Sequence, residues 1–102
     1  MSFSHLSIQE LSQQLASEEK PTILDIRDAD SFHAGHIEHA LNLNNSNLQA
    51  LVAKLDKSEP VVICCYHGNS SQGVAHWFSE QGFDKVYSLD GGFEAWSRLH
   101  QN

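Results

Sequence analysis

Two adjacent cysteines, Cys64 and Cys65, end a continuous apolar run and are followed by a short polar loop. Pro60 precedes the run, and beyond the loop apolar side chains recur at helical spacing until Gly82. This order predicts a strand buried on both faces, a tight loop, and a helix with a C-terminal glycine cap. Backbone N–H groups of the loop and of the first helical turn would converge on one point, so the stretch predicts an anion site beside Cys65.

Cys65 is the predicted nucleophile. A free thiol has a pKa of about 8.5 and is only a few per cent ionised at neutral pH, whereas nearby N–H dipoles favour the thiolate. Because neighbouring side chains of a strand face opposite ways, Cys64 is predicted to lie in the core when Cys65 faces the loop. The alternative for Cys65 is an unreactive buried side chain, since unpaired cysteines are often buried.

The six residues after Cys65 form the predicted substrate-binding loop. Their N–H groups would bind an anion held beside Cys65. The serine hydroxyls could add donors or could only cap the helix, and the histidine could supply positive charge or simply lie in solvent. The loop residues are Tyr66, His67, Gly68, Asn69, Ser70 and Ser71.

Further candidates are predicted near this loop because ligands gather outside the carboxyl ends of parallel strands. Asp25 and Arg27 end a β-rich stretch, and they either reach the site or form an ion pair that fixes the following loop. The paired glycines Gly91 and Gly92 follow the last predicted strand. Glycines allow a close approach of backbone, so this pair is predicted to wall the pocket.

The remaining segments alternate between strand and helix patterns, which indicates an α/β domain with a mostly parallel sheet covered on both faces. A capping box of Ser7 and Glu10 begins the first helix. The other predicted elements are a strand at 22–27, a helical turn at 28–35, an edge strand at 40–43, a helix over 48–55 capped from 44–46, a strand at 84–89 and a turn at 90–92 leading into 93–96.

Composition limits the kinds of partner and compartment that are expected for this protein. The chain has 102 residues, enough for one domain that buries about two thirds of its unfolded surface. A formal charge of −7, from 13 acidic and 6 basic residues, argues against nucleic acid or an anionic membrane. No stretch approaches the roughly 18 apolar residues of a membrane span, and the first residues lack the pattern of an export signal. We therefore expect a reducing, cytoplasmic compartment, without a structural disulfide between the adjacent cysteines.

No metal or cofactor is expected. Three of the seven histidines fall between His33 and His39, but their spacing matches no zinc motif and makes no compact pair with the cysteines. Solvated or hydrogen-bonded histidines are the simpler interpretation.

Four motifs resemble the rhodanese domain in order and spacing, over essentially the whole chain 1–102. They are Asp25-Ile26-Arg27, then Gly35-His36-Ile37 with Ala40, then the loop that Cys65 begins, and then Asp90-Gly91-Gly92-Phe93-Glu94-Ala95-Trp96. The loop resembles that of the small single-domain thiosulfate sulfurtransferases of the GlpE type. One departure is His39, which stands where the family usually has a glycine.

The resemblance implies a rhodanese-like three-layer sandwich with a five-stranded, mostly parallel sheet between helices. It also implies that Cys65 carries sulfur as a persulfide. Residues near the site with a structural role would be Asp25, Arg27, His36, Gly91 and Gly92.

The implied reaction takes the outer sulfur of thiosulfate, releases sulfite, and passes the sulfur to cyanide or a thiol acceptor, such as a dithiol protein like thioredoxin. A cysteine phosphatase is one alternative, although no arginine between Cys65 and Ser71 could clamp a phosphoryl group. A non-catalytic or redox-sensing binding module, in which Cys65 takes up oxidants or docks a partner, is another.

Overall fold

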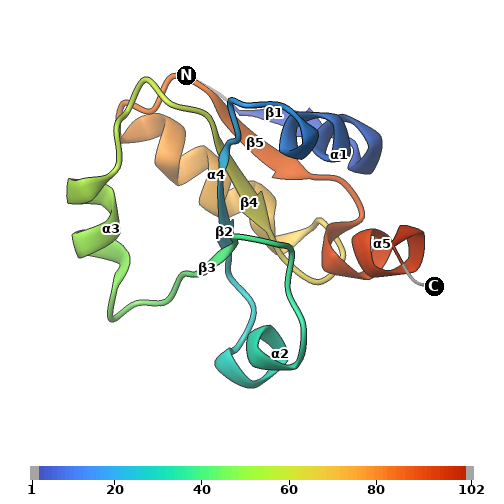
Figure 1. Ribbon diagram of the computed structural model, residues 1–102. Helices are drawn as coiled ribbons and strands as arrows, with labels where there is room; N and C mark the ends of the chain where they lie inside the picture. Colours follow the sequence, from blue (N-terminus) through green and yellow to red (C-terminus); the bar gives the residue numbers. More distant parts are fainter. Residues whose placement is uncertain (1–2, 101–102) are drawn as a thin grey trace.

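Figure 1 shows the protein as a computed structural model, which describes residues 3–100. One parallel sheet has the strand order β1-β5-β4-β2-β3. The strands are β1 (Ser4–Leu6), β2 (Thr22–Asp25), β3 (Leu41–Asn42), β4 (Val61–Cys64) and β5 (Val86–Leu89). The helices are α1 (Ile8–Ala16), α2 (Ala29–Ala34), α3 (Leu48–Lys54), α4 (Ser70–Glu80) and α5 (Gly92–Leu99).

Two apolar cores, one on each face, hold the sheet between the helices. Alternate residues of β4 separate cleanly, because Val62 and Cys64 join the core under α1, α2 and α5, while Val61 and Ile63 join the core under α3 and α4. The same division is visible in Figure 1, where α1 and α5 lie on one side of the strands and α3 and α4 on the other. The predicted three-layer α/β sandwich is confirmed.

Local sequence explains where the helices begin and end. The predicted capping box is present, since Ser7 Oγ accepts from the Glu10 amide while the Glu10 carboxylate accepts from the Ser7 amide. Helix α4 ends at Glu80, and Gly82 follows with φ of +98°, a conformation that favours glycine. Helix α1 therefore begins, and helix α4 ends, where the sequence signals predict.

Two predictions about elements need correction. The residues taken alone indicate no strand before the first helix, yet Ser4–Leu6 forms β1 on the outside of β5. Helix α3 is not capped by a side chain from 44–46. Its N-cap is Asn47, which makes no side-chain cap bond, and instead Asn44 and Asn47 each accept the other's amide in a closed turn.

The central position of β4 matters most for the site. It pairs with β2 on one side and β5 on the other, so its carboxyl end opens at the middle of the sheet edge. Because the loop after β4 begins there, segments that follow the neighbouring strands can reach it.

Candidate active site

The sulfur of Cys65 lies inside the loop that joins β4 to α4. The residue is 3% exposed, and its sulfur accepts the backbone N–H of Gly68 at 3.1 Å and that of Ser71 at 3.3 Å. The loop N–H groups of Tyr66, Asn69 and Ser70 have no hydrogen-bond acceptor among the described residues. The loop therefore offers further donors to an anion next to the sulfur.

These contacts decide the acidity of the thiol. Burial alone would raise the pKa of Cys65, because it penalises the charged form. The Ser71 hydroxyl and the backbone N–H groups of Ser71, Gly68 and His67 outweigh burial and lower the pKa below its ordinary value. The geometry thus favours a thiolate without any cationic neighbour in the loop.

Cys64 has the opposite environment. It is fully buried in the core under α1, α2 and α5, as predicted from its place on the strand. Burial raises the pKa of its thiol, and the nearby Asp25 carboxylate raises it further. Both cysteines are free thiols, but only Cys65 faces the loop.

Helix α5 supports the loop from behind. The Phe93 amide donates to the Cys65 carbonyl at 2.7 Å, and the Glu94 amide donates to the Tyr66 carbonyl at 3.0 Å. Gly92 allows this approach, because a Cβ at this position would lie 2.5 Å from the Cys65 oxygen. The first N–H groups of α5, which lack partners within the helix, thereby find acceptors in the loop.

The predicted role of the glycine pair is therefore refined. Gly91 and Gly92 lie against the loop backbone, and a Cβ on Gly68 would lie 2.8 Å from the Gly91 nitrogen. The loop after β4 and the turn after β5 meet at these glycines. Both contacts are close enough that a side chain would not fit between the two backbones. The glycines pack two loops together, which is a supporting role.

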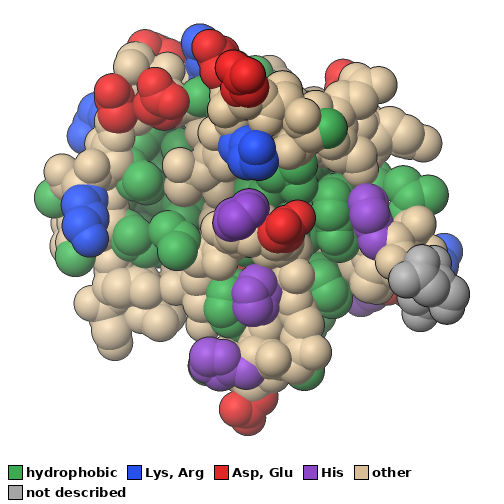
Figure 2. Space-filling view, viewed as in Figure 1, with side chains coloured by type: hydrophobic (Ala, Val, Ile, Leu, Met, Phe, Trp, Pro, Cys, Tyr) green, Lys and Arg blue, Asp and Glu red, His purple; other side chains and the backbone are tan. Residues whose placement is uncertain are grey.

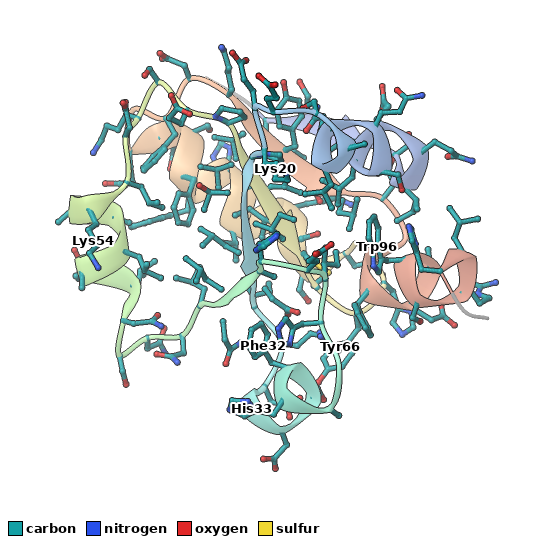
Figure 3. The ribbon with its side chains drawn as sticks, in the orientation of Figure 1. Lys20, Phe32, His33, Lys54, Tyr66 and Trp96 are labelled. Atoms are coloured by element: carbon teal, nitrogen blue, oxygen red, sulfur yellow. The ribbon has the colours of Figure 1, made fainter. Side chains whose placement is uncertain are left out.

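Tyr66 forms one rim of the loop. The residue is 44% exposed, and its ring reaches toward α2 (Figure 3), where its hydroxyl bonds to the Asp28 carboxylate and lies 2.9 Å from Ser31 Oγ. The Tyr66 hydroxyl, followed by the donors of Ser31, lowers the pKa of Asp28 to about 2. This contact ties the loop after β4 to the helix that follows β2.

The other loop side chains fall into two groups. His67 is exposed and lies 3.3 Å from the Glu94 carboxylate, while Asn69 and Ser70 are exposed at the start of α4. Ser71 is fully buried, and its hydroxyl lies 2.7 Å from that of Ser88 instead of capping the helix. Of the two predicted serine donors, only Ser71 is directed into the protein.

Asp25 and Arg27 form a buried ion pair. Arg27 is 6% exposed and Asp25 is fully buried, with Nη2 of Arg27 2.8 Å from the carboxylate. The guanidinium also donates to the Gly35 carbonyl and lies 4.0 Å from the Phe93 ring centroid. Of the two roles considered for Arg27, the structure shows the ion pair that fixes the following loop.

His36 belongs to α2 more than to the loop. Its ring stacks on Phe32 at 3.8 Å, and its Nδ1 lies 2.7 Å from the Phe32 carbonyl. Within residues 3–100, no three His, Cys, Asp or Glu side chains come together as a metal site requires. His36 therefore packs against α2 through Phe32, which is a structural role.

Sequence reasoning missed Ser88 and Asp28. Ser88 is the polar residue within the buried part of β5, and Asp28 is the N-cap of α2. A fully buried serine in an otherwise apolar strand is a usable signal, because such a hydroxyl must find a partner. The contact of Asp28 with Tyr66 has no comparable signal in the sequence.

Comparison with known proteins defines the class. A sequence model of the rhodanese-like domain matches residues 7–99, and the chain belongs to the rhodanese family. It is 53% identical over 95 residues to the thiosulfate sulfurtransferase GlpE of Shewanella oneidensis, and the match covers 93% of each chain. The protein is therefore a rhodanese-type sulfurtransferase.

Solved structures share the fold. The rhodanese-like domain of a protein from Anabaena sp. superimposes with a TM-score of 0.83 at 26% identity, covering 94% of this chain and 74% of that one. A rhodanese-like domain protein from Staphylococcus aureus gives a TM-score of 0.82 at 22% identity, covering 92% and 91%. Across the described residues, no helix is long and apolar enough to span a membrane.

Proposed function

We propose that this protein is a thiosulfate sulfurtransferase that works as one rhodanese domain over 1–102, with Cys65 as the catalytic nucleophile. The observation that carries the proposal is the Cys65 sulfur held by N–H donors of Gly68 and Ser71. Such donors favour a thiolate and can stabilise a sulfur anion bound to it. The relative from Shewanella oneidensis, named as a thiosulfate sulfurtransferase, supports thiosulfate as the donor.

The first half-reaction transfers one sulfur atom. The Cys65 thiolate attacks the outer sulfur of thiosulfate, and a new S–S bond forms while the S–S bond of thiosulfate breaks. Sulfite leaves with the bonding electron pair. The product is a Cys65 persulfide whose outer sulfur is anionic, so the total charge is unchanged.

The loop supplies the stabilisation for this step. The transferred charge moves from the Cys65 sulfur to the next sulfur outward, and N–H groups of Tyr66, Asn69 and Ser70 are available to receive it. These donors are fixed before the reaction, because α5 and the Gly68 turn hold the loop backbone. The substrate-binding residues that we propose are Tyr66, His67, Gly68, Asn69, Ser70 and Ser71.

The second half-reaction returns the enzyme to its thiolate form. Cyanide attacks the outer persulfide sulfur, the persulfide S–S bond breaks, and thiocyanate leaves. A thiol acceptor or a dithiol protein such as thioredoxin takes the sulfur in the same way, at the exposed rim formed by Tyr66, Asn69 and Ser70. Two free cysteines suit a reducing cytoplasmic compartment.

The net charge of the protein affects how it can bind thiosulfate, the proposed sulfur donor. The protein carries a formal charge of −7, which opposes the approach of a dianion over long range. On the face shown in Figure 2, histidines gather around α2, and Lys and Arg side chains lie away from it. Capture of thiosulfate therefore depends on short-range N–H donors, and its KM should rise when ionic strength is lowered, because the repulsion is then less screened.

The test is thiocyanate formation from thiosulfate and cyanide by a matched pair of variants. Cys65→Ser should abolish turnover, because serine cannot carry sulfane sulfur. Cys64→Ser should retain much of it, since Cys64 faces the core. Equal loss in two folded variants would mean that the nucleophile is misassigned.

The same preparation discriminates against phosphatase chemistry. Phosphoryl transfer needs a planar cationic fork, and Arg27 is occupied by Asp25 beneath the loop. Hydrolysis of an aryl phosphate without thiocyanate formation would reverse the assignment. Absence of both activities would leave a binding or redox-sensing role for Cys65.

A further inference from the structure

Ser88 is a buried residue that is linked to the proposed nucleophile through one other residue, Ser71. Its Oγ lies 2.7 Å from Ser71 Oγ, which brings β5 and α4 together at residues 17 apart in sequence. Ser88 and Ser71 are both fully buried. Ser71 in turn donates its backbone N–H to the Cys65 sulfur at 3.3 Å.

The two possible directions of this hydroxyl contact differ in where the second proton goes. Each serine has one hydroxyl proton, and one contact joins the two. Among the hydrogen bonds of the described residues, the Ser88 hydroxyl has Ser71 as its partner and no other side chain or carbonyl. If Ser71 donated, the Ser88 proton would be buried without an acceptor, which costs free energy. Donation by Ser88 avoids this cost when the Ser71 proton has an acceptor of its own.

The proton of Ser71 is then free for another acceptor. The Cys65 sulfur is the neighbouring acceptor, since Ser71 already bonds to it through its backbone. The Ser71 hydroxyl is also among the groups that lower the pKa of Cys65. With Ser88 as donor, the two hydroxyls would form a chain from β5 to the Cys65 sulfur.

We propose that Ser88 is a positioning residue for sulfur transfer. By donating to Ser71, it turns the Ser71 hydroxyl proton toward the Cys65 sulfur and holds it there through both half-reactions. The proposal rests on Cys65 being the nucleophile, and it extends the site beyond the loop to β5. Ser88 does not touch the substrate in this scheme.

The titratable side chains around the loop have partners of their own. A change in the pKa of Cys65 can therefore be assigned to the two hydroxyls. Behind the loop on β4 stands the buried Cys64 thiol. The remaining side chains are paired: Tyr66 with Asp28, His67 with Glu94, Arg27 with Asp25, and Asp90 with His5.

The experiment measures the rate of Cys65 alkylation by iodoacetamide against pH, followed by peptide mass spectrometry. Ser88→Ala should move the midpoint upward by roughly half a unit, which lowers the thiolate fraction below the midpoint roughly threefold. Ser79→Ala is the matched control, because Ser79 is an equally buried serine whose hydroxyl bonds only to the His76 carbonyl on α4. Its midpoint should equal that of the unmodified protein.

A double-mutant cycle separates this role from a structural one. If Ser88 acts through Ser71, then Ser88→Ala should add no shift to the Ser71→Ala variant. The isosteric pair Ser88→Thr and Ser88→Val repeats the comparison at equal volume, and only the valine should raise the midpoint. An unshifted midpoint in Ser88→Ala, or full additivity with Ser71→Ala, would overturn the proposal.

The readout also keeps this inference apart from the proposed function. Alkylation needs no thiosulfate, so a failed Ser88 result leaves the sulfur-transfer assay untouched. A midpoint of the unmodified protein at or above that of a free thiol would count against Cys65 as nucleophile and hence against both.

Discussion

The Phe93 amide donates a 2.7 Å hydrogen bond to the carbonyl of Cys65. Through this bond the first turn of α5 holds the backbone of the residue proposed to carry sulfur. The Cys65 side chain meanwhile accepts N–H groups from its own loop and from α4. The reactive residue is therefore held on its carbonyl side by one helix and on its sulfur side by another.

Gly92→Ala tests this support. A methyl group at this position would lie 2.5 Å from the Cys65 oxygen, and the backbone has a φ of +61°. We expect a loss of about 2 kcal/mol in the free energy of unfolding and at least about tenfold in turnover. Urea unfolding and the thiocyanate assay measure the two effects.

Gly73→Ala is the control for that substitution. It lies within α4, and a Cβ there meets nothing within 4 Å. The variant should gain roughly 0.5–1 kcal/mol from helix propensity and keep its activity. Wild-type turnover in Gly92→Ala would mean that the α5 contact does not shape the loop.

Arg27→Met tests the buried ion pair. The change leaves the fully buried Asp25 carboxylate without its partner, which should cost about 3–5 kcal/mol. Arg98→Met breaks the exposed pair of Arg98 and Glu94 and should cost under about 1 kcal/mol. Chemical denaturation decides, and equal losses in the two variants would be incompatible with a structural role for Arg27.

His39→Gly is expected to stabilise the protein. His39 has a φ of +71°, the left-handed region that disfavours residues with a Cβ, and its side chain is exposed. The gain should be about 1 kcal/mol in the free energy of unfolding. His39→Ala keeps the Cβ and should give no such gain; similar stability for the two variants would show that the imidazole is the cause.

The pH dependence of stability reports on the contact between Tyr66 and Asp28. The folded-state pKa of Asp28 is about 2, below its ordinary value of 3.8, so the contact contributes stability above that ordinary value and loses it as pH falls through about 2. Tyr66→Phe removes the largest cause of this shift. Its stability deficit, measured in urea, should shrink as pH falls from about 5 to about 2. A deficit independent of pH would argue for packing by the ring as its source.

How far the sequence predicts this protein depends on the range of each contact. The order of β4, loop and α4 follows from an apolar run, a glycine and helical spacing, all of which are local signals. Strand β1 was not predicted, because it has three residues directly before a capping box and is too short to show the alternation of apolar and polar residues typical of a strand. Its place is set by pairing with β5, which comes late in the chain.

The site divides in the same way. The place of Cys65 at the end of a strand, in the loop that leads into a helix, could be predicted from neighbouring residues. Phe93 contacts the loop from helix α5, Asp28 from the connection after β2, and Ser88 from strand β5, so these contacts exist only once the sheet has formed. The sequence predicts that Gly91 and Gly92 allow a close approach of backbone, but only the structure shows that they lie behind the loop.

The most direct test of the account is intact-protein mass spectrometry after incubation with thiosulfate, repeated after addition of cyanide. We predict a gain of one sulfur atom on Cys65, its loss with cyanide, and release of thiocyanate. The Cys65→Ser variant should gain nothing. No adduct on a folded protein with reduced Cys65 would contradict the persulfide mechanism and direct attention to a binding role.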